Sequence, residues 1–253
     1  MKHLDSPLAG TSLGPEVQSY PRFPERIPAG TFEHRRVAAR FARLPSELDE
    51  ILRLRFEVFN VELAEGLDRS WRTHRDEDEY DLACHHLLVE DRESHRVVGT
   101  SRLQTSIMAA VGRGFYSAGE FDLHRLPDEV LSDAVEIGRA CIAADRRNRF
   151  VLFLLWQGLA RYLTSHGKRF FFGCCSLPGQ DAAVGWRLYE QLLGEGRVHP
   201  RLHVEPLPEL AAPRPHDSVL TKMDRVEVPT LFRTYLRYGA MVCSPPAIDR
   251  QFK

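Results

Sequence analysis

The chain has 253 residues and a formal net charge of −1, with 43% hydrophobic and 27% charged residues. This composition fits a soluble globular protein with a sizeable core, and the near-neutral charge argues against an overall electrostatic grip on nucleic acid. The longest apolar run, 150–156, is far below the roughly 20 residues of a membrane-spanning helix. The N-terminus lacks the apolar run of a secretory signal and the five cysteines form no CxxC pair, so we expect a cytoplasmic protein with free thiols.

The pattern along the chain predicts one folded domain after an N-terminal segment without a fixed fold. Residues 1–35 are rich in Pro, Gly and Ser and predict a disordered or extended segment, so that the domain spans 36–253. Strands are predicted at 36–45, 83–91, 95–106, 133–143, 169–177 and 241–243, with a hairpin turn at 92–95. Helices are predicted at 46–63, 149–165, 181–193 and 229–240, and a charged loop at 66–81.

The order of these elements predicts the fold class. A strand, a buried helix and a second strand in succession imply a parallel crossover. The earlier strands pair as hairpins, so we expect an α/β fold with a mixed, mostly antiparallel central sheet, one parallel βαβ crossover and helices on both faces.

Four short motifs put charged side chains where a strand or helix should face the core. They are Arg55 with Phe59 (R-x-x-x-F), Asp78 with Asp81 (D-x-x-D), Gly99 with Arg102 (G-x-x-R-L) and Glu136 with Arg139 (E-x-x-R). An inward guanidinium needs a carboxylate or a pocket that opens to solvent. The motifs therefore predict a charged site in the interior of the domain.

The order and spacing of these motifs resemble the acyl-homoserine-lactone synthases, which belong to the Gcn5-related N-acyltransferase (GNAT) superfamily. Over about residues 45–253 the chain more closely resembles a sister family, the bacterial ornithine-lipid-synthesis N-acyltransferases. The segments that carry this second resemblance are "CHHLLVED", "FYSAGEFDL", "EIGRACI", "LLWQGLARYL", "FFFGCCSL", "YLRYGAMVC" and "PAIDRQF".

The resemblance implies a GNAT-like fold and an acyltransferase. The enzyme would transfer a long acyl group, with or without a 3-hydroxyl group, to the α-amine of an amino acid. Ornithine is the expected amino acid. The donor would be the phosphopantetheine thioester of acyl carrier protein, and no cofactor would be permanently bound. The product would be lyso-ornithine lipid, so a peripheral membrane contact at the inner face is compatible with this function.

Two departures from the resembled families stand out. The synthases carry a Trp soon after the Phe of the first motif, whereas Trp71 lies twelve residues beyond Phe59, so we do not transfer its role. The ornithine family continues past "DRQF" into a further apolar strand. Because this chain stops at Lys253, either a final strand is missing or the sheet closes differently.

Amine attack on a thioester requires a base and a donor for the oxyanion. Glu136 is the candidate base, since burial in mid-strand favours uptake of a proton by a carboxylate, and Arg139 is the second catalytic candidate. Strict alternation would send Glu136 and Arg139 to opposite faces of the sheet. A bulge at Gly138 would bring both side chains into one cleft.

The remaining charged residues are assigned to the two substrates. The resemblance implies that the acceptor amino acid is bound by Arg55, Phe59, Asp78, Asp81 and Arg102. The alternative is that these charged residues form a stabilising ion-pair cluster without ligand contact. We expect acyl carrier protein and its phosphopantetheine to be bound by Arg146, Arg147 and Arg149. The alternative is that these arginines only solvate the end of a helix. The turn that holds these three, "RRNRFV", lacks the glycines of a pyrophosphate-binding loop, which disfavours acyl-CoA as donor.

Other functions stay open. His85 and His86 are adjacent in a strand and point to opposite faces, so we expect no metal site. Synthesis of another N-acyl amino acid or of an acyl-homoserine lactone is the alternative within enzymes. A non-catalytic module that binds acyl thioesters is the alternative from another class.

Overall fold

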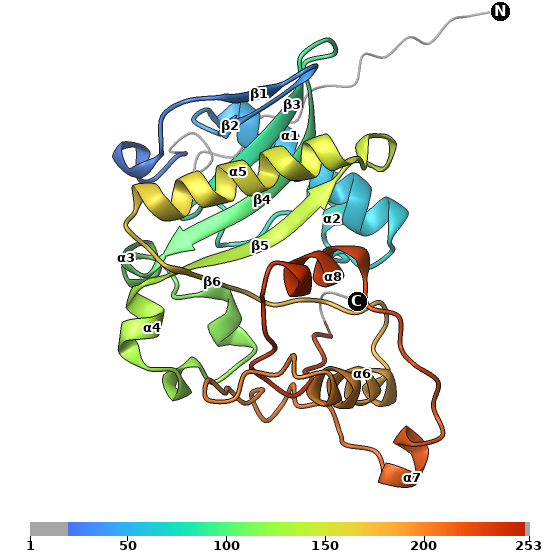
Figure 1. Ribbon diagram of the computed structural model, residues 1–253. Coiled ribbons are helices and arrows are strands. Elements are labelled where there is room, and N and C mark those ends of the chain that lie inside the picture. Colours follow the sequence, from blue (N-terminus) through green and yellow to red (C-terminus); the bar gives the residue numbers. More distant parts are fainter. Residues whose placement is uncertain (1–19, 251–253) are drawn as a thin grey trace, which may run out of the picture.

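The computed structural model describes residues 20–250, which form one six-stranded sheet in the order β1-β2-β3-β4-β5-β6 (Figure 1). The strands β1 to β5 pair antiparallel and β5 pairs with β6 in parallel. The predicted mixed, mostly antiparallel sheet with one parallel crossover is therefore confirmed. The strands are β1 Phe32–His34, β2 Val37–Phe41, β3 His85–Asp91, β4 Arg96–Thr105, β5 Ala134–Ile142 and β6 Phe170–Phe172.

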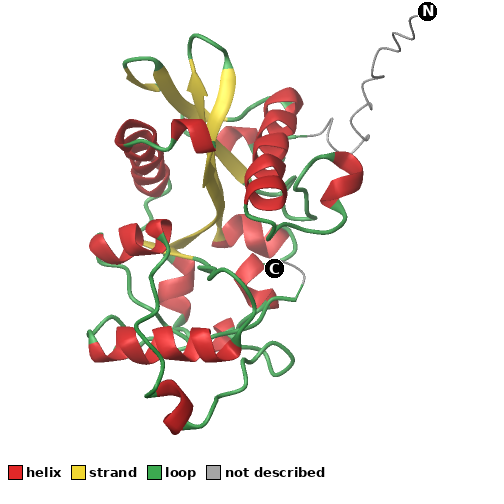
Figure 2. Cartoon of the chain, turned by 90° about the vertical axis from the view of Figure 1, so that its right-hand side faces the viewer, coloured by secondary structure: helices red, strands yellow, loops and turns green. Residues whose placement is uncertain are grey.

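Helices cover both faces of this sheet, as the two sides of the edge-on view in Figure 2 show. The long helix α5 lies on one face and α1 on the other (Figure 1). The helices are α1 Pro45–Phe56, α2 Ser70–Thr73, α3 Ser106–Val111, α4 Asp128–Ser132, α5 Arg149–Ser165, α6 Ala182–Gly194, α7 Asp217–Leu220 and α8 Thr230–Arg237. A π-helical segment, Glu57–Glu62, continues α1, and short 3-10 turns include Tyr116–Gly119.

The main core lies on both faces of the sheet, beneath α5 and beneath α1. Val151, Leu154 and Tyr162 of α5 are fully buried, which fits the hydrophobic run that the sequence showed there. Gly158 lets α5 approach β3, because a Cβ at this position would lie only 2.5 Å from Cδ1 of Leu87. The close contact explains why a helix interior tolerates a glycine.

The fold begins earlier and its C-terminal part is less regular than the sequence suggested. Of the segment 1–35 that was predicted to be disordered or extended, residues 1–19 lie outside the described part, but Tyr20 and Ile27 are buried in the main core and β1 pairs with β2. At the other end, the expected strand 241–243 is reduced to a single bridge between Val198 and Val242. Here α6 and α8 enclose a small second core.

Two irregularities of β5 shape the region beside it. Arg102 pairs with Gly138 and Thr100 pairs with Cys141, so β5 has one residue more than β4 over this stretch. This bulge contains Arg139, whose φ of 47° is the left-handed conformation that favours glycine. The parallel pairing with β6 ends at Glu136, whereas β5 continues to Ile142. One edge of β5 is therefore left without a strand partner beyond Glu136.

Candidate active site

A buried network of opposite charges lies on the α1 face of the sheet. Arg55 of α1 is fully buried and donates from Nε to Oδ1 of Asp76 at 2.8 Å and from Nη1 to Oδ1 of Asp81 at 2.6 Å. Burial opposes ionisation of Asp81, but the guanidiniums of Arg55 and Arg102 outweigh it and hold the pKa of this carboxyl below its ordinary value. Asp81 is thus a carboxylate at neutral pH.

Two more arginines complete this network. Arg102 of β4 donates from Nη1 to Asp78 at 2.5 Å and to Asp81 at 3.0 Å. Arg139 donates from Nη2 to Asp78 at 3.3 Å, and its Nε lies 3.4 Å from Asp76. We use the name charged network for these six side chains: Arg55, Arg102, Arg139, Asp76, Asp78 and Asp81. Three positive and three negative charges balance, which lets the fold bury them.

Glu136 lies beside the charged network and is held by four donors. Its Oε2 accepts from Nε2 of Gln104 at 2.6 Å and from the backbone N–H of Tyr116 at 2.9 Å. Its Oε1 accepts from the backbone N–H and the hydroxyl of Ser117, each at 2.7 Å. Because a carboxylate has about four acceptor positions, Glu136 has little capacity left for a direct bond to a substrate amine.

Tyr116 connects Glu136 to Arg139. Its N–H binds Glu136, and its ring centroid lies 5.2 Å from Cζ of Arg139 and 5.4 Å from Cζ of Arg102. Tyr80 packs edge-on against Tyr116 with 5.5 Å between centroids. Glu136 and Arg139 therefore lie on the same side of β5, and the bulge resets the alternation as expected, although its left-handed residue is Arg139 and not Gly138.

A small cavity opens at the end of the charged network. It has a volume of about 70 Å³ and is lined by Leu67, Arg69, Asp78, Glu79, Tyr80, Tyr116, Arg139 and Asp249. Of the predicted acceptor residues, Asp78 reaches this cavity. Arg55, Asp81 and Arg102 lie behind it in the charged network, and Phe59 belongs to the main core.

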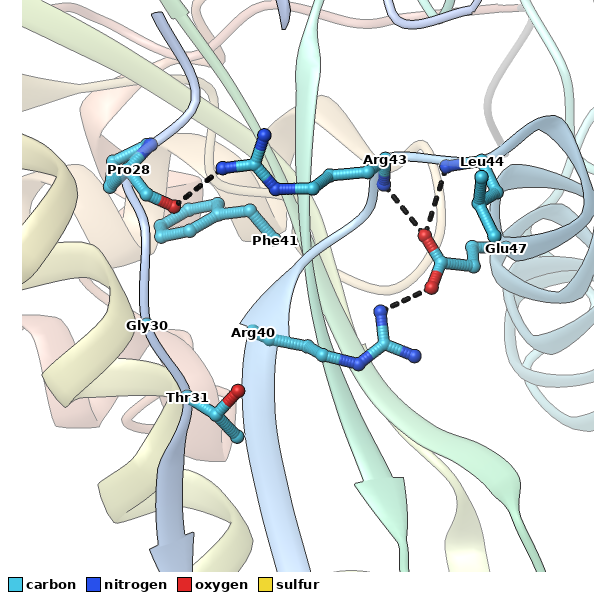
Figure 3. Close-up of a pocket in the computed structure, with 8 residues that line it drawn as sticks. All are labelled: Pro28, Gly30, Thr31, Arg40, Phe41, Arg43, Leu44 and Glu47. Carbon is cyan, nitrogen blue, oxygen red and sulfur yellow. Dashed lines mark hydrogen bonds and ion pairs between the residues drawn. The ribbon is translucent and has the colours of Figure 1, made fainter.

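A larger cavity of about 420 Å³ lies elsewhere, between β1, β2 and the start of α1 (Figure 3). Its polar groups bind one another: Glu47 accepts from the N–H groups of Arg43 and Leu44 at 2.6 and 3.0 Å and pairs with Arg40. None of the predicted site residues lines it. The smaller cavity is therefore the one that combines ligand access with the predicted chemistry.

A second carboxylate stands near the small cavity. Burial, and after it the charge of Asp249, raise the pKa of Glu120. The hydroxyl of Tyr116 donates to Asp249 at 3.4 Å. The thiol of Cys174 donates to the hydroxyl of Ser117 at 3.4 Å, and burial raises the pKa of this thiol well above its ordinary value, so Cys174 is not a thiolate.

Two of the three arginines assigned to acyl carrier protein are occupied by intramolecular ion pairs. Arg146 binds Asp91 at 3.1 Å and Arg147 binds both oxygens of Glu62. Arg149 is exposed and lies over the ring of Phe150, 4.9 Å from its centroid.

The turn before α5 has no open anion cradle. Asn148 caps the helix, and its side-chain oxygen accepts from the N–H groups of Phe150 and Val151 at 2.9 and 3.2 Å. These first-turn N–H groups are the ones that bind phosphate at a helix N-terminus. A side chain of the protein thus takes the place that a pyrophosphate would need.

The two adjacent histidines have structural partners. His85 Nδ1 lies 2.8 Å from the hydroxyl of Tyr162, and His86 Nε2 lies 3.0 Å from the carbonyl oxygen of Asp81. Across residues 20–250 no group of three or more metal-ligating side chains is present. Within the same range every helix is too short or too polar to traverse a bilayer.

Several site residues were not predicted from the sequence. Asp76 was missed because the D-x-x-D pattern drew attention to Asp78 and Asp81, although it stands in the same acidic run. Tyr116 and Ser117 lie in the segment "GRGFYSAGEFDL", which has no helical or strand periodicity. The donors that hold Glu136 are partly backbone N–H groups, and these leave no trace in residue type.

Comparisons with known proteins place this site in context. Residues 54–157 match the model of a family described as an acetyltransferase (GNAT) domain. The chain is 33% identical over 224 residues to L-ornithine N(alpha)-acyltransferase of Rhizobium meliloti (strain 1021), which covers 85% of this chain and 76% of the relative. The protein of the same name from Brucella abortus (strain 2308) is 32% identical over 84% of this chain and 79% of the relative.

Solved structures with lower similarity include two acyl-homoserine-lactone synthases. LasI has a TM-score of 0.41 and 15% identity over 67% of this chain and 80% of its own. BjaI, a CoA-dependent synthase solved with SAM and isopentyl-CoA, has a TM-score of 0.36 and 21% identity over 81% of this chain and 88% of its own.

Proposed function

Since the chain belongs to the L-ornithine N(alpha)-acyltransferase family, we propose that this acyltransferase moves a long acyl group from acyl carrier protein to the α-amine of ornithine. The observation that carries the proposal is the position of Glu136, Tyr116 and Arg139 at the point where β5 loses its partner β6. A thioester beside β5 and an amino acid in the small cavity would meet there.

The donor would occupy the unpaired edge of β5. Beyond Glu136, a backbone N–H group on the edge of β5 that β6 does not pair would bind the oxyanion that forms when the amine attacks the carbonyl carbon. The amine nitrogen forms an amide bond with this carbon and the carbon–sulfur bond breaks. The phosphopantetheine sulfur leaves and ends as a thiol once it has taken up a proton.

The acceptor would bind in the small cavity. Arg139 offers a guanidinium for the α-carboxylate, since a guanidinium matches the geometry of a carboxylate. Asp78 and Asp249 on the wall of the cavity offer carboxylates for a side-chain ammonium. This pairing favours an amino acid with a cationic side chain, such as ornithine, over glycine or an aromatic amino acid.

The proton of the amine would reach Glu136 through a hydroxyl. Glu136 is surrounded by donors, but one of them, Ser117, has a hydroxyl that can pass a proton to Oε1 while it accepts another. Cys174 already donates to this hydroxyl from the side of the segment after β6. We therefore assign proton acceptance to Glu136 with Ser117 as the relay, and substrate binding to Arg139.

The capped helix favours acyl carrier protein over CoA as donor. Asn148 occupies the N–H groups that a pyrophosphate would use, whereas a carrier protein presents a single phosphodiester and an acidic surface. Arg149 and Arg35 stack on Phe150 at this end of α5, and within residues 20–250 neither forms an ion pair. Their charges suit an acidic partner.

The test is an assay with two donors and a panel of amino acids. The full chain is incubated with 3-hydroxyacyl, plain acyl and acetyl thioesters of acyl carrier protein or CoA, and free thiol is measured. We expect thiol release with long-chain acyl carrier protein and ornithine, and a product mass of N-acylornithine. Equal turnover with acyl-CoA would refute the donor assignment, and absence of thiol release with every acceptor would indicate a binding module.

A further inference from the structure

We propose that the outward faces of α5 and α8 dock on the surface of an anionic lipid bilayer. We call this surface the α5–α8 face and define it by Phe153, Trp156, Arg161, Arg237 and Tyr238. The inference extends the proposed function, whose product is an amphiphile that a bilayer takes up. The binding itself can be measured without any substrate.

The α5–α8 face exposes aromatic side chains that the fold does not need to expose. Phe153 is 52% exposed and Tyr238 is 68% exposed. The indole of Trp156 joins the two helices, since its ring centroid lies 4.5 Å from that of Tyr238. Aromatic rings with a polar tip, such as Tyr and Trp, are the side chains that accumulate at the headgroup level of membranes.

The charges of this face are of one sign. Within α5 and α8 themselves the sequence has four arginines and no acidic residue, and one of the four, Arg233, is paired with Glu227. The whole chain, in contrast, has a net charge of −1. Arg161 and Arg237 are exposed, and in the described part of the chain neither forms an ion pair. Such cations are free to bind anionic headgroups.

The geometry of the helices places these groups together. Phe153 lies opposite the buried residues of α5, and Trp156 and Arg161 flank it at about 60° and 80° on its two sides. Figure 1 shows α5 along one face of the sheet and α8 below it, and the ring contacts of Trp156 with Tyr235 and Tyr238 connect the two helices. Leu236 and Phe232 of α8 belong to the small second core, against which Leu177, which follows β6, also packs. The α5–α8 face therefore adjoins the segment that leaves β5 unpaired.

A bilayer fits this surface better than a protein partner does. None of the residues that define it lines either of the two cavities described above. The combination of exposed aromatic rings and unpaired arginines is typical of interfacial binding. Acyl carrier protein is expected at Arg149 and Arg35, at the end of α5.

The experiment is sedimentation of the full chain with vesicles, without substrates. Vesicles of phosphatidylglycerol and phosphatidylcholine are compared with phosphatidylcholine alone, at low and high salt. We expect binding to the anionic vesicles that weakens with salt. The double variant Phe153→Ser and Tyr238→Ser should weaken the partition coefficient about tenfold or more, and Arg161→Gln about fivefold.

Two control variants match these changes at a distance from the face. Val111→Ser on α3 removes an apolar side chain that is 67% exposed, and Arg72→Gln on α2 removes an exposed cation. Both should bind vesicles as the unmodified chain does. Circular dichroism checks that every variant is folded, and turnover with long-chain acyl carrier protein and ornithine in the absence of vesicles should be unchanged in all of them.

The outcomes separate the membrane from the carrier protein. The proposal fails if the unmodified chain does not bind anionic vesicles, or if the variants of the face bind as the controls do. It also fails if Arg161→Gln keeps vesicle binding but lowers turnover with acyl carrier protein, because the face would then belong to the carrier. A chain that binds vesicles but does not acylate ornithine would contradict the proposed function and leave this inference standing.

Discussion

Replacing Glu136 by Gln tests the arrangement of the site most directly. Glutamine has the same shape but only one carbonyl oxygen, so one of the two positions that accept hydrogen bonds becomes an NH2 group. In either orientation this group faces a backbone N–H, that of Tyr116 or that of Ser117. The hydroxyl of Ser117 or the amide of Gln104 can turn to accept, but a backbone N–H cannot.

The cost follows from these contacts. A buried N–H that loses a charged acceptor costs about 1.5–3 kcal/mol, and the three remaining bonds weaken because the acceptor is now neutral. We expect the free energy of unfolding to fall by about 3 kcal/mol, with a range of roughly 2–5 kcal/mol. A domain of ordinary stability still folds after such a loss.

The assay combines urea unfolding followed by circular dichroism with thiol release over a range of pH. The control is Glu209→Gln, a change of the same chemistry in an exposed loop, which should stay within about 0.5 kcal/mol. If Glu136→Gln changes stability by less than about 1 kcal/mol, the four-donor argument is wrong. If it keeps most of its turnover at every pH, Glu136 is not the proton acceptor.

Three further predictions concern the acceptor, the core and the response to acid. Arg139→Gly removes the guanidinium but keeps the left-handed backbone, which glycine adopts without strain. The KM for ornithine should rise about tenfold or more while the KM for the donor stays constant. A constant KM for ornithine would exclude Arg139 from the acceptor site. Gly158→Ala should lower stability by about 1–2 kcal/mol in urea unfolding, since overpacking against Leu87 outweighs the gain in helix propensity, whereas Gly194→Ala, whose Cβ would contact nothing within 4 Å, should not. Burial lowers the pKa of His85 to about 3 and of His86 to about 4, so below the ordinary value of 6.5 the unfolded chain binds more protons than the folded one. The two buried rings therefore cost no stability well above pH 6.5, and the free energy of unfolding falls by up to about 2.7 kcal/mol per pH unit towards pH 4. Urea unfolding that shows a slope below about 1 kcal/mol per unit would contradict the burial of both rings.

The sequence predicts the elements whose signals are local. The hairpin turn at 92–95 and the bounds of α5 follow from periodicity and turn residues, and the parallel crossover follows from the order of elements. The bulge in β5 could be predicted because two opposite charges three residues apart need it. The left-handed residue of the bulge is Arg139, one residue after the predicted Gly138. Arg139 adopts this strained conformation while its side chain is held in the charged network.

The sequence does not predict what depends on distant partners. The sequence predicts Arg147 as a cation for acyl carrier protein, but its partner Glu62 is 85 residues away and only the fold brings them together. The donors of Glu136 lie in an irregular segment and act largely through backbone N–H groups. The strand expected at 241–243 does not form, because in the irregular C-terminal part its only β-bridge among the described residues joins Val242 to Val198.

The cap of α5 has a consequence for how such enzymes choose between donors. Acyl-CoA and acyl carrier protein present the same thioester on the same pantetheine arm, so contacts along this arm cannot tell them apart. Under the proposed function, Asn148 would discriminate by exclusion, because its side chain occupies two N–H groups of the first turn of α5 that a second phosphate would otherwise bind. Selectivity of this kind needs no large interface, and a change at a single side chain could widen or narrow the range of acyl donors without altering the reacting centre.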